Sequence, residues 1–499
     1  MRPEVAAPVV EAEPRKTGQL EINMAKHTEY DLCIIGGGAA GLVVAAGAAT
    51  LGAKVILVEK QALGGDCLHY GCVPSKTLIH SAKVAHAIRT ADRFGIPGQT
   101  PAVDLAAVMR RVQAVIQHIA PNDSPERFAA LGVEVIFGAG RFTAADRFTV
   151  NARAISAKNF VLATGSRPAL PPLPGLEHTP YLSNETLFSM RENIPHLLVL
   201  GGGPIGCELA QSLARLGSQV SLFDLAPRIL PREDADMTAV INAQFQQEGI
   251  ALHLGVKVLK VAASADGIRV SLAHPQQGEY SLEGSHLLLA AGRQANLENL
   301  GLELAGVSVN QGKLLVDARL RTTNKRIFAC GDVVGPYLFT HMAEHQAGVV
   351  LRNTLFGWPS KAQTTNIPWC TYTDPELARV GLSVAEAQQA GLDHRVYRFP
   401  FAAVDRAVTA GETAGLAKII TTPKGKLLGA CIAGPQAGEL IAEYVLALNK
   451  GMTAADLSNT IHIYPTLAQI NRRVADQRLK EALTPRRKEW LKRIFGFRG

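Results

Sequence analysis

A pattern of strand, glycine turn, helix and second strand occurs twice in this chain of 499 residues. The two copies begin YDLCIIGGGAAG and HLLVLGGGPIGC, and the second lies 165 residues after the first. Their GxGxxG glycines are Gly36, Gly38 and Gly41 in the first copy and Gly201, Gly203 and Gly206 in the second. Such glycines allow a tight turn and bring a pyrophosphate close to a helix N-terminus. A single motif is weak evidence, but the repetition predicts two dinucleotide-binding units.

Each copy ends on a carboxylate. Glu59 and Asp224 both follow the last glycine of their copy by 18 residues, where a carboxylate can accept hydrogen bonds from a ribose diol. Two dinucleotides in one chain are typical of enzymes in which a nicotinamide delivers hydride to a flavin, so we expect FAD and NAD(P)H. Asp224 would repel a 2′-phosphate, which favours NADH, whereas Arg228, four residues further on, leaves NADPH open.

Two cysteines lie five residues apart in GGDCLHYGCVPSK, residues 64–76. In one continuous helix, Cys67 and Cys72 would be too far apart for a disulfide, so we expect Cys67 in a loop folded back toward Cys72. Pro74 suits a first helical turn, which would place the Cys72 sulfur at the positive end of the helix and lower the pKa of its thiol. Lys76 lies on the same helical face and adds positive charge. We interpret the pair as reactive thiols rather than as inert core residues.

Composition excludes several classes of protein. With 47% hydrophobic and 19% charged residues, the chain can bury a large core. The net charge of +8 is concentrated in residues 486–499, which hold six basic residues and one acidic one, so nucleic-acid binding is not expected. Seven cysteines without a regular framework favour a reducing compartment, and no spacing predicts a resident metal. We interpret the charge-free run from Leu32 to Ala53 as a soluble strand and helix, not a membrane span.

The predicted fold is α/β, with two Rossmann-like dinucleotide-binding domains for FAD and NAD(P), followed by a C-terminal α+β domain of the interface type. A Pro/Gly-rich stretch at residues 168–175 marks one boundary, and the strand-like segments GLAKIITT and LLGACIAG mark the last domain. The predicted parts are a polar leader, 1–28; an FAD-binding domain in two pieces, 29–174 and 291–360; an NAD(P)-binding domain, 175–290; a dimerisation domain, 361–484; and a basic amphipathic tail, 485–499.

With these motifs the chain resembles the class I FAD-dependent pyridine nucleotide-disulfide oxidoreductases, which include dihydrolipoamide dehydrogenase, glutathione reductase and mercuric reductase. The resemblance runs from about residue 28 to 483. Its matching pieces are both GxGxxG units, the C-x4-C-VPSK segment, the ATG at residues 163–165, the FACGD at residues 328–332 and the YTDPELARVG at residues 372–381.

The resemblance implies a homodimer in which Cys67 and Cys72 form a redox disulfide. Cys72 would contact the flavin, Cys67 would attack the acceptor, and Lys76 would pair with Glu208 near the flavin. The residues implied to hold FAD are Gly36, Gly38, Gly41, Glu59, Gly65, Lys76, Ala163, Thr164, Gly165 and Asp332. Those implied to hold NAD(P) are Gly201, Gly203, Gly206, Asp224 and Gly292.

The chain departs from the family at its acid/base dyad. Dihydrolipoamide dehydrogenases and glutathione reductases carry a His-Pro-Thr segment, with Glu five residues after the His, given across the dimer as a general acid/base. Here HIYPTLAQ places Tyr464 and Gln469 at those positions. His462 would face the opposite side of an extended segment, so we interpret it as structural. Mercuric reductases also place Tyr there but need a C-terminal cysteine pair, whereas no cysteine follows Cys431. Asp66 stands where the family usually has Thr.

The sequence therefore predicts an NAD(P)H-dependent FAD flavoprotein that passes electrons through Cys67 and Cys72 to a small-molecule disulfide, metal-ion or quinone acceptor, with Tyr464 in the catalytic set. Dihydrolipoamide dehydrogenase is the alternative within the family. A cofactor-binding structural or regulatory flavoprotein is the alternative of another class.

The tail pattern places Trp490, Leu491, Ile494 and Phe497 on one side of a helix, which is typical of an interfacial helix. With no secretory signal in the sequence, we expect a cytoplasmic enzyme with peripheral contact at the inner membrane face through residues 486–499. A solvated or self-packed tail is the alternative.

Overall fold

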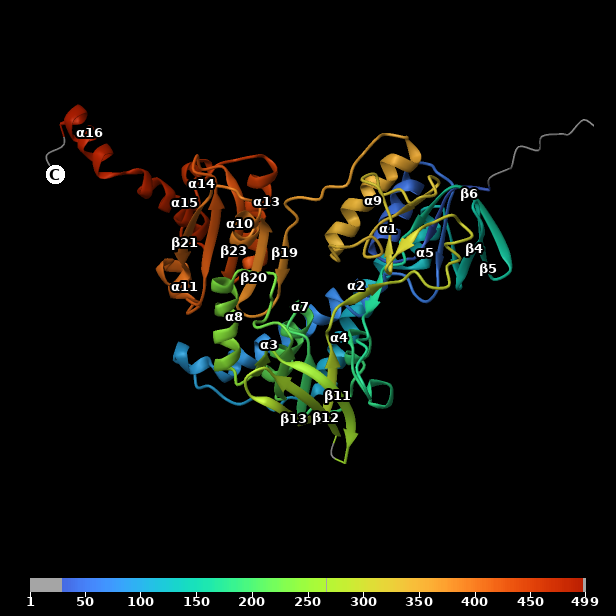
Figure 1. Ribbon diagram of the computed structural model, residues 1–499, viewed down its shortest axis with the longest axis horizontal. Coiled ribbons are helices and arrows are strands. Elements are labelled where there is room, and N and C mark those ends of the chain that lie inside the picture. The colour runs from blue at the N-terminus through green and yellow to red at the C-terminus, as the bar shows by residue number, and fades with distance from the viewer. Residues whose placement is uncertain (1–28, 266, 497–499) are drawn as a thin grey trace, which may run out of the picture.

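The computed structural model describes residues 29–265 and 267–496. The predicted polar leader, residues 1–28, lies outside the described residues. Figure 1 shows three sheet-based parts, with the first dinucleotide unit at the right, the second below and the C-terminal part at the left. The α/β class is confirmed, because parallel strands joined by helical crossovers form both dinucleotide units.

The first predicted unit consists of β1 (Tyr30–Ile35), α1 (Ala39–Thr50) and β2 (Val55–Glu59). β1 pairs in parallel with β2 and β6, and both of its faces are covered, which explains its continuous apolar sequence. α1 is apolar on every side because it packs against both this sheet and α9 (Thr340–Leu355), with Val44 and Val350 in one core. The charge-free run from Leu32 to Ala53 is therefore a buried strand and a 12-residue helix.

The first sheet has seven strands in the order β3-β2-β1-β6-β5-β4, and β18 pairs with β6, so the chain returns to this sheet after the second unit. Its remaining strands are β3 (Val133–Phe137), β4 (Gly140–Ala144), β5 (Arg147–Val150), β6 (Arg153–Leu162) and β18 (Ile327–Ala329). Two small pairings are β7 (Ser166–Pro168) with β15 (Arg293–Ala295) and β16 (Val309–Asn310) with β17 (Lys313–Leu314).

Four helices lie between β2 and β3. They are α2 (Gly65–His69), α3 (Cys72–Arg89), α4 (Leu105–Ile119) and α5 (Pro125–Ala130). α3 and α4 share a hydrophobic core with the second dinucleotide unit, in which Leu78 and Met109 join Leu209 and Leu213 of α7. This packing places the helix that carries Cys72 beside the helix that follows the second glycine turn.

The second unit is a four-stranded parallel sheet in the order β10-β9-β8-β14, with an antiparallel layer β11-β12-β13 beside it. The parallel strands are β8 (His196–Leu200), β9 (Gln219–Asp224), β10 (Ala251–Leu254) and β14 (His286–Leu289). The antiparallel strands are β11 (Lys257–Ser264), β12 (Gly267–His274) and β13 (Gly278–Gly284). The helices are α6 (Asn184–Leu187), α7 (Pro204–Arg215) and α8 (Ala235–Gln247).

The C-terminal part is a five-stranded antiparallel sheet in the order β19-β20-β23-β22-β21. Its strands are β19 (Trp369–Thr371), β20 (Glu376–Gly381), β21 (Arg395–Pro400), β22 (Leu416–Thr421) and β23 (Leu427–Gly434). Its helices are α10 (Val384–Gln389), α11 (Asp405–Thr409), α12 (Ala437–Leu440), α13 (Ala442–Asn449), α14 (Ala454–Asn459) and α15 (Gln469–Ala482). The two strand-like segments predicted from the sequence are β22 and β23.

The basic tail forms α16 (Pro485–Phe495), which extends away from the C-terminal part in Figure 1. The Thr484 side chain caps it, and none of its residues is buried. Trp490 and Ile494 are more than half exposed, while Phe497 lies outside the described residues. No helix in the described part of the chain is both long and apolar enough to cross a membrane.

Candidate active site

The first glycine turn leaves no room for side chains. At Gly36, with φ of 109°, an added Cβ would lie 2.3 Å from the Ala163 carbonyl oxygen, and at Gly41 it would lie 1.9 Å from the Gly36 carbonyl oxygen. Gly38 is the N-cap of α1, and no side chain caps the helix there. The first amides of α1 are therefore available to an anion.

The second turn repeats this geometry. At Gly201, with φ of 116°, a Cβ would lie 2.4 Å from the Ala290 carbonyl oxygen, and at Gly206 it would lie 1.9 Å from the Gly201 carbonyl oxygen. Gly203 is the N-cap of α7, again without a side-chain cap. Gly292, also at positive φ, lies two residues after Ala290 just beyond β14, as Gly165 lies two residues after Ala163 just beyond β6. Both units thus present an uncapped helix N-terminus beside a crowded turn.

The two carboxylates also hold equivalent positions. Glu59 accepts hydrogen bonds from the Gly37 and Gln61 amides at 2.7 and 2.8 Å. Asp224 accepts them from the Gly202 and Ala226 amides at 2.6 and 2.7 Å. Each carboxylate is fixed at the end of its strand and retains lone pairs that can accept from a ribose.

FAD fits the first unit. Gly65 approaches Gly38 so closely that a Cβ on Gly65 would lie 2.6 Å from the Gly38 Cα, which leaves a backbone-lined surface for a pyrophosphate. Asp332 follows β18, accepts a hydrogen bond of 2.6 Å from the Ser166 hydroxyl, and has its pKa raised by burial. Thr164, between Ala163 and Gly165, donates to a backbone carbonyl at 2.7 Å and thereby fixes that loop.

The redox pair lies at the junction of two helices. Cys72 is the first residue of α3, as Pro74 predicts, and both cysteines are free thiols. The expectation that Cys67 lies in a loop is wrong. Cys67 lies in the one-turn helix α2, and the chain reverses at Tyr70 and Gly71, so two short helical axes replace one continuous helix.

The electrostatics at this junction favour a Cys72 thiolate. A hydrogen bond from Cys67, a second from Thr340 and the charge of Lys76 lower the pKa of Cys72 to about 6, against the opposing effect of burial. The Cys72 sulfur lies 3.6 Å from the Thr340 hydroxyl oxygen. The same pairing raises the pKa of Cys67, which therefore keeps its proton.

Lys76 and Glu208 form the ion pair implied by the family resemblance. Lys76 Nζ donates to Glu208 Oε2 at 2.8 Å, and the Glu208 side chain is only 7% exposed. Glu208 Oε1 also accepts from the Tyr372 amide at 2.9 Å, and Lys76 Nζ lies 4.4 Å from the centre of the Tyr372 ring. Both charges are thus held at the contact between α3 and α7.

The departure at Asp66 has partners of its own. Its Oδ1 accepts from Arg293 Nη2 at 3.1 Å and from Asn184 Nδ2 at 3.2 Å. Asn184 also donates to the Tyr70 carbonyl at 3.1 Å, so one amide ties Asp66 to the turn between the cysteines. Arg293 donates to Ser166 as well, at 2.8 Å. The carboxylate introduced at Asp66 is therefore compensated by a guanidinium.

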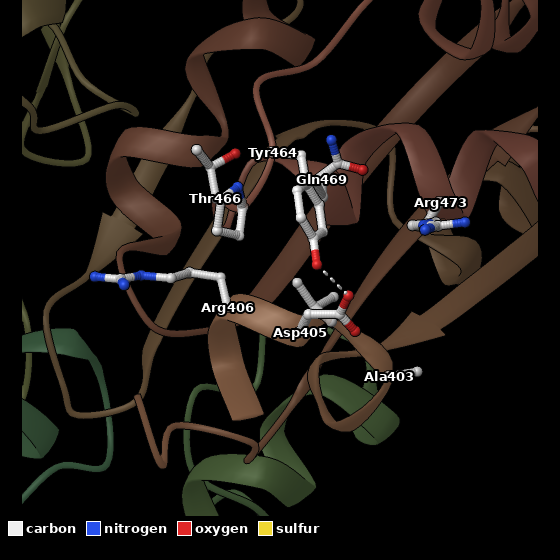
Figure 2. A pocket seen from close by; sticks show the side chains of 9 residues that line it. Ala403, Asp405, Arg406, Tyr464, Thr466, Gln469 and Arg473 are labelled. Carbon is white, nitrogen blue, oxygen red and sulfur yellow. Dashed lines mark hydrogen bonds between the residues drawn. The ribbon is translucent and has the colours of Figure 1, made fainter. Parts of the chain in front are cut away.

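In a single chain, no contact between described residues links Tyr464 to Cys67 or Cys72. Its hydroxyl donates to Asp405 at 3.0 Å, which raises the pKa of the tyrosine, and the residue is 66% exposed (Figure 2). Gln469 donates to the His462 carbonyl at 3.0 Å. His462 lies 2.9 Å from Glu443, and its side chain is only 6% exposed, which agrees with the interpretation of a structural histidine.

A groove opens beside Cys72 between α3 and α4. Its volume is about 400 Å³, and it is lined by Cys72, Val73, Lys76, Thr77, His80, Arg111, Val115 and Ile119. Cys72 itself is exposed, so a small molecule could reach its sulfur from this groove.

Sequence reasoning missed several contacts of this site. Thr340 at the Cys72 sulfur, Tyr372 at the Lys76 pair and Asp405 at Tyr464 all come from distant segments. Thr340 follows the FACGD segment by eight residues and Tyr372 begins the YTDPELARVG match, so proximity to these motifs was the available signal. Asp405 has no signal in the sequence.

Comparison with protein families matches residues 30–347 to the pyridine nucleotide-disulphide oxidoreductases and residues 367–474 to the dimerisation domain of that family. The chain is 37% identical over 467 residues to a dihydrolipoyl dehydrogenase of Thermus scotoductus, covering 91% of this chain and 98% of the relative. It is 35% identical over 451 residues to a mercuric reductase of Streptomyces lividans, covering 89% and 95%.

Among solved structures, the HOCl-induced flavoprotein disulfide reductase RclA from Escherichia coli is similar, with a TM-score of 0.80 and 29% identity over 90% of this chain and 99% of that one. A Cu(II) complex of the same protein matches with a TM-score of 0.80, 28% identity and the same coverage. These matches, the repeated glycine turns and the Cys67–Cys72 junction agree with one another. The chain therefore belongs to the class I pyridine nucleotide-disulfide oxidoreductases and is an FAD flavoprotein disulfide reductase that uses NAD(P)H and carries the family's dimerisation domain.

Proposed function

We propose that this enzyme passes two electrons from NADH through FAD and the Cys67–Cys72 pair to a soft metal ion or another small acceptor that needs no proton from a His–Glu dyad. One contrast carries the proposal. The electron-entry residues match the family; they are Lys76, Glu208 and both cysteines. By contrast, Tyr464 and Gln469 replace the dyad that serves disulfide substrates.

The two cysteines have separate roles in this proposal. FAD, when bound, relays the electron pair from the nicotinamide to the disulfide. The products are NAD⁺, a Cys72 thiolate stabilised by Lys76 and the α3 N-terminus, and a Cys67 thiol that takes up one proton. Cys67 then gives its proton to solvent as it attacks the acceptor, and the disulfide re-forms as a disulfide or Hg(II) takes both electrons or two Cu(II) ions take one each.

The dimer supplies Tyr464. Ile461 and Ile463, on either side of His462, are 92% and 79% exposed, and Leu446 is 60% exposed. Apolar side chains this exposed are typical of a surface that another subunit covers. We therefore place the hydroxyl of Tyr464, fixed by Asp405, at the thiols of the partner subunit in a homodimer.

The names of the relatives support a metal-ion acceptor. One relative is a mercuric reductase, and one similar structure is a Cu(II) complex of a flavoprotein disulfide reductase. Thiolate sulfur is a soft ligand that suits soft metal ions. Because this chain lacks a cysteine after Cys431, the ion would be delivered to the thiols without a C-terminal cysteine pair.

NADH is the proposed electron donor rather than NADPH. The carboxylate of Asp224, fixed by the Gly202 amide at the end of β9, would repel a 2′-phosphate. Arg228, the residue that left NADPH open, donates instead to the Pro231 and Glu233 carbonyls at 3.0 and 3.2 Å. One nitrogen of its guanidinium, Nη2, is therefore held by the loop after β9.

The helix α16 supports peripheral membrane contact from the cytoplasm. Trp490 and Ile494 lie on one exposed face, and most of the other side chains are basic. Each basic residue near an anionic surface contributes about 1 kcal/mol. Full-length protein should co-sediment with anionic liposomes in low salt, and protein truncated after Thr484 should not. Equal sedimentation would leave α16 as a solvated tail.

We also propose the domain boundaries that the sequence predicts, in which two pieces of the FAD-binding domain flank the NAD(P)-binding domain. The return of β18 to the first sheet supports this division.

An acceptor screen tests the proposed function. Purified holoenzyme with NADH is assayed against lipoamide, small disulfides, quinones, Hg(II) and Cu(II), with the Cys67→Ser protein as the blank for non-enzymatic reduction. The proposal expects metal ions to be reduced fastest. Fast lipoamide reduction would indicate a dihydrolipoamide dehydrogenase. Flavin reduction by NADH without turnover on any acceptor would indicate a cofactor-binding flavoprotein of structural or regulatory function.

A further inference from the structure

The loop between β9 and α8, residues 225–234, holds the second glycine turn from both sides. The Gly202 amide donates to Asp224, where the loop begins, and the Gly202 carbonyl accepts from the Leu230 amide at 2.8 Å. Ile229 lies against the same glycine, 3.3 Å from where a Cβ of Gly202 would be. A shift of this loop must therefore move the turn.

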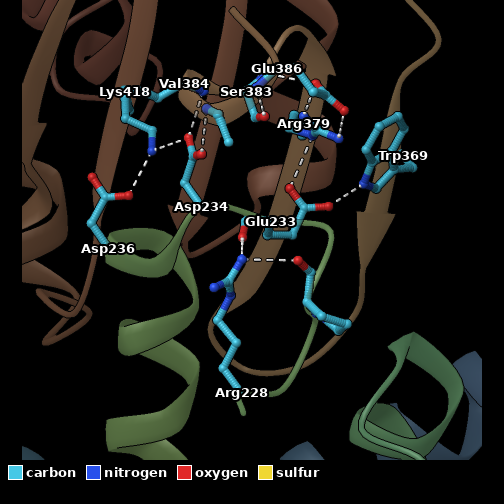
Figure 3. A network of polar contacts seen from close by, with 12 residues as sticks. Arg228, Glu233, Asp234, Asp236, Trp369, Arg379, Ser383, Val384, Glu386 and Lys418 are labelled. Carbon is cyan, nitrogen blue, oxygen red and sulfur yellow. Dashed lines mark hydrogen bonds and ion pairs between the residues drawn. The ribbon is translucent and has the colours of Figure 1, made fainter. Parts of the chain in front are cut away.

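The far end of the loop is buried against the dimerisation domain (Figure 3). Glu233, only 5% exposed, accepts from Trp369 Nε1 at 2.7 Å and lies 3.1 Å from Arg379 Nε. The Arg379 side chain is 2% exposed and also pairs with Glu386 at 2.6 Å. The loop is thus tied to strands β19 and β20 by groups that water does not reach.

A second buried cation continues this contact. Lys418 on β22 has a fully buried side chain, and its Nζ lies 2.6 Å from both Asp234 and Asp236, which flank the start of α8. Asp234 also accepts from the Val384 amide at 3.1 Å, at the start of α10. Buried ion pairs of this kind are poor sources of net stability, but they fix geometry because breaking them strands a charge.

We propose that Lys418 and Arg379 are positioning residues for NAD(P)H, because they anchor the loop that holds the second glycine turn. The dimerisation domain thereby controls the affinity for the nicotinamide dinucleotide, although neither cation reaches the proposed binding surface. This inference rests on the proposed NAD(P)H site around Asp224, and its test includes that site.

The chain offers a matched control. Arg215, at the end of α7, is 4% exposed and pairs with Glu248 at 2.6 Å and with Asp374 at 2.7 Å. It joins the second dinucleotide unit to the dimerisation domain, as Lys418 does. Its contacts lie at the opposite end of α7 from the glycine turn and do not include the loop.

The experiment compares Lys418→Met, Asp236→Asn, Arg215→Met and Asp224→Ala as FAD-loaded holoenzymes, with ferricyanide as the acceptor. Steady-state kinetics give KM for NADH and kcat, and calorimetry gives the affinity of the oxidised enzymes for NAD⁺. Lys418→Met should raise KM by roughly fivefold or more and weaken NAD⁺ binding, with kcat changed by less than about twofold. Asp236→Asn, which leaves Lys418 one carboxylate, should show a smaller rise.

Arg215→Met should lose comparable thermal stability and keep the KM of the unmodified enzyme. An equal rise in KM for Arg215→Met and Lys418→Met would overturn the inference, because general loosening of the domain contact would then suffice. An unchanged KM in Lys418→Met would also overturn the inference. If Lys418→Met yields no holoenzyme, an unchanged KM in Asp236→Asn would overturn it instead. Asp224→Ala with an unchanged KM would instead overturn the proposed NAD(P)H site.

Discussion

The redox junction and the surface around Tyr464, which we propose to serve the same reaction, are built differently. At the junction, Cys72, Lys76 and Glu208 come from α3 and α7 of one chain and are held by packed helices. Tyr464 lies on an exposed segment, two-thirds accessible, with Asp405 as its hydrogen-bond partner. Cys72, Lys76 and Glu208 match the family, although Asp66 beside them departs from it, and the second region departs from the family in both residues of the dyad.

In the proposed reaction, electrons enter at the redox junction, which we call the entry half. They leave near Tyr464, which we call the exit half. A change at Tyr464 can alter which acceptor is used without disturbing how NADH reduces the enzyme, because no described contact joins Tyr464 to Lys76 or Glu208 in one chain. The entry half is constrained by the packing of α3 against α7 and by the buried Glu208, so we expect substitutions there to affect every acceptor. The exit half is free to change with the chemistry of the acceptor.

The largest effect is expected at Cys72. Cys72→Ser should abolish turnover with all acceptors that need the thiol pair, as well as the long-wavelength charge-transfer absorption between the thiolate and oxidised flavin. Absorption spectroscopy of the purified yellow protein and steady-state assays measure both. Cys67→Ser is the control: it should also lose turnover but retain the charge-transfer absorption. Absorption that survives in Cys72→Ser would reverse the two roles.

Introducing a His–Glu dyad tests whether the residues at positions 464 and 469 limit the reduction of disulfides. Tyr464→His combined with Gln469→Glu supplies an imidazole and a carboxylate, and general acid/base catalysis is worth roughly 10² to 10⁴ in rate. The rate of lipoamide reduction should rise by up to that factor. The rate of flavin reduction by NADH in a stopped-flow experiment should stay the same. A double variant with unchanged lipoamide activity would show that the dyad is not what limits this acceptor.

The choice of cofactor belongs to the entry half. We expect kcat/KM for NADH to exceed that for NADPH by about tenfold or more, which corresponds to about 1.4 kcal/mol, because Asp224 repels the 2′-phosphate. Steady-state kinetics with both cofactors measure the ratio. Asp224→Ser should narrow it, and a preference of the unmodified enzyme for NADPH would refute the assignment of Asp224.

The smallest effect is a shift in pH dependence at the junction. The pKa of Cys72 is lowered to about 6, so the thiolate is present above that pH and is lost as the pH falls through it. In Cys67→Ser the charge-transfer absorption should therefore disappear with a midpoint near 6. In Cys67→Ala, which removes the hydrogen bond to Cys72, the midpoint should rise. Equal midpoints in the two variants would mean that Lys76 and Thr340 set the pKa without Cys67.

The predictability of the two regions also differs. The glycine turns, the start of α3 at Cys72 and the pair between Lys76 and Glu208 follow from local patterns or from the family resemblance. The helical conformation of Cys67 does not, because the spacing argument excludes one continuous helix but not two short ones. The contacts of Asp405 with Tyr464 and of Arg293 with Asp66 join distant segments, and no periodicity specifies such pairings.

In the proposed reaction, electrons leave Cys67 without help from a protein acid/base dyad. The test mixes NADH-reduced enzyme anaerobically with lipoamide, Cu(II) or Hg(II) and follows the loss of the charge-transfer absorption, with Cys67→Ser as the blank. A metal ion should reoxidise the reduced thiol pair at least roughly 10² times faster than lipoamide does. Lipoamide turnover at ~10 to 10³ per second, as in an ordinary efficient enzyme, would contradict it.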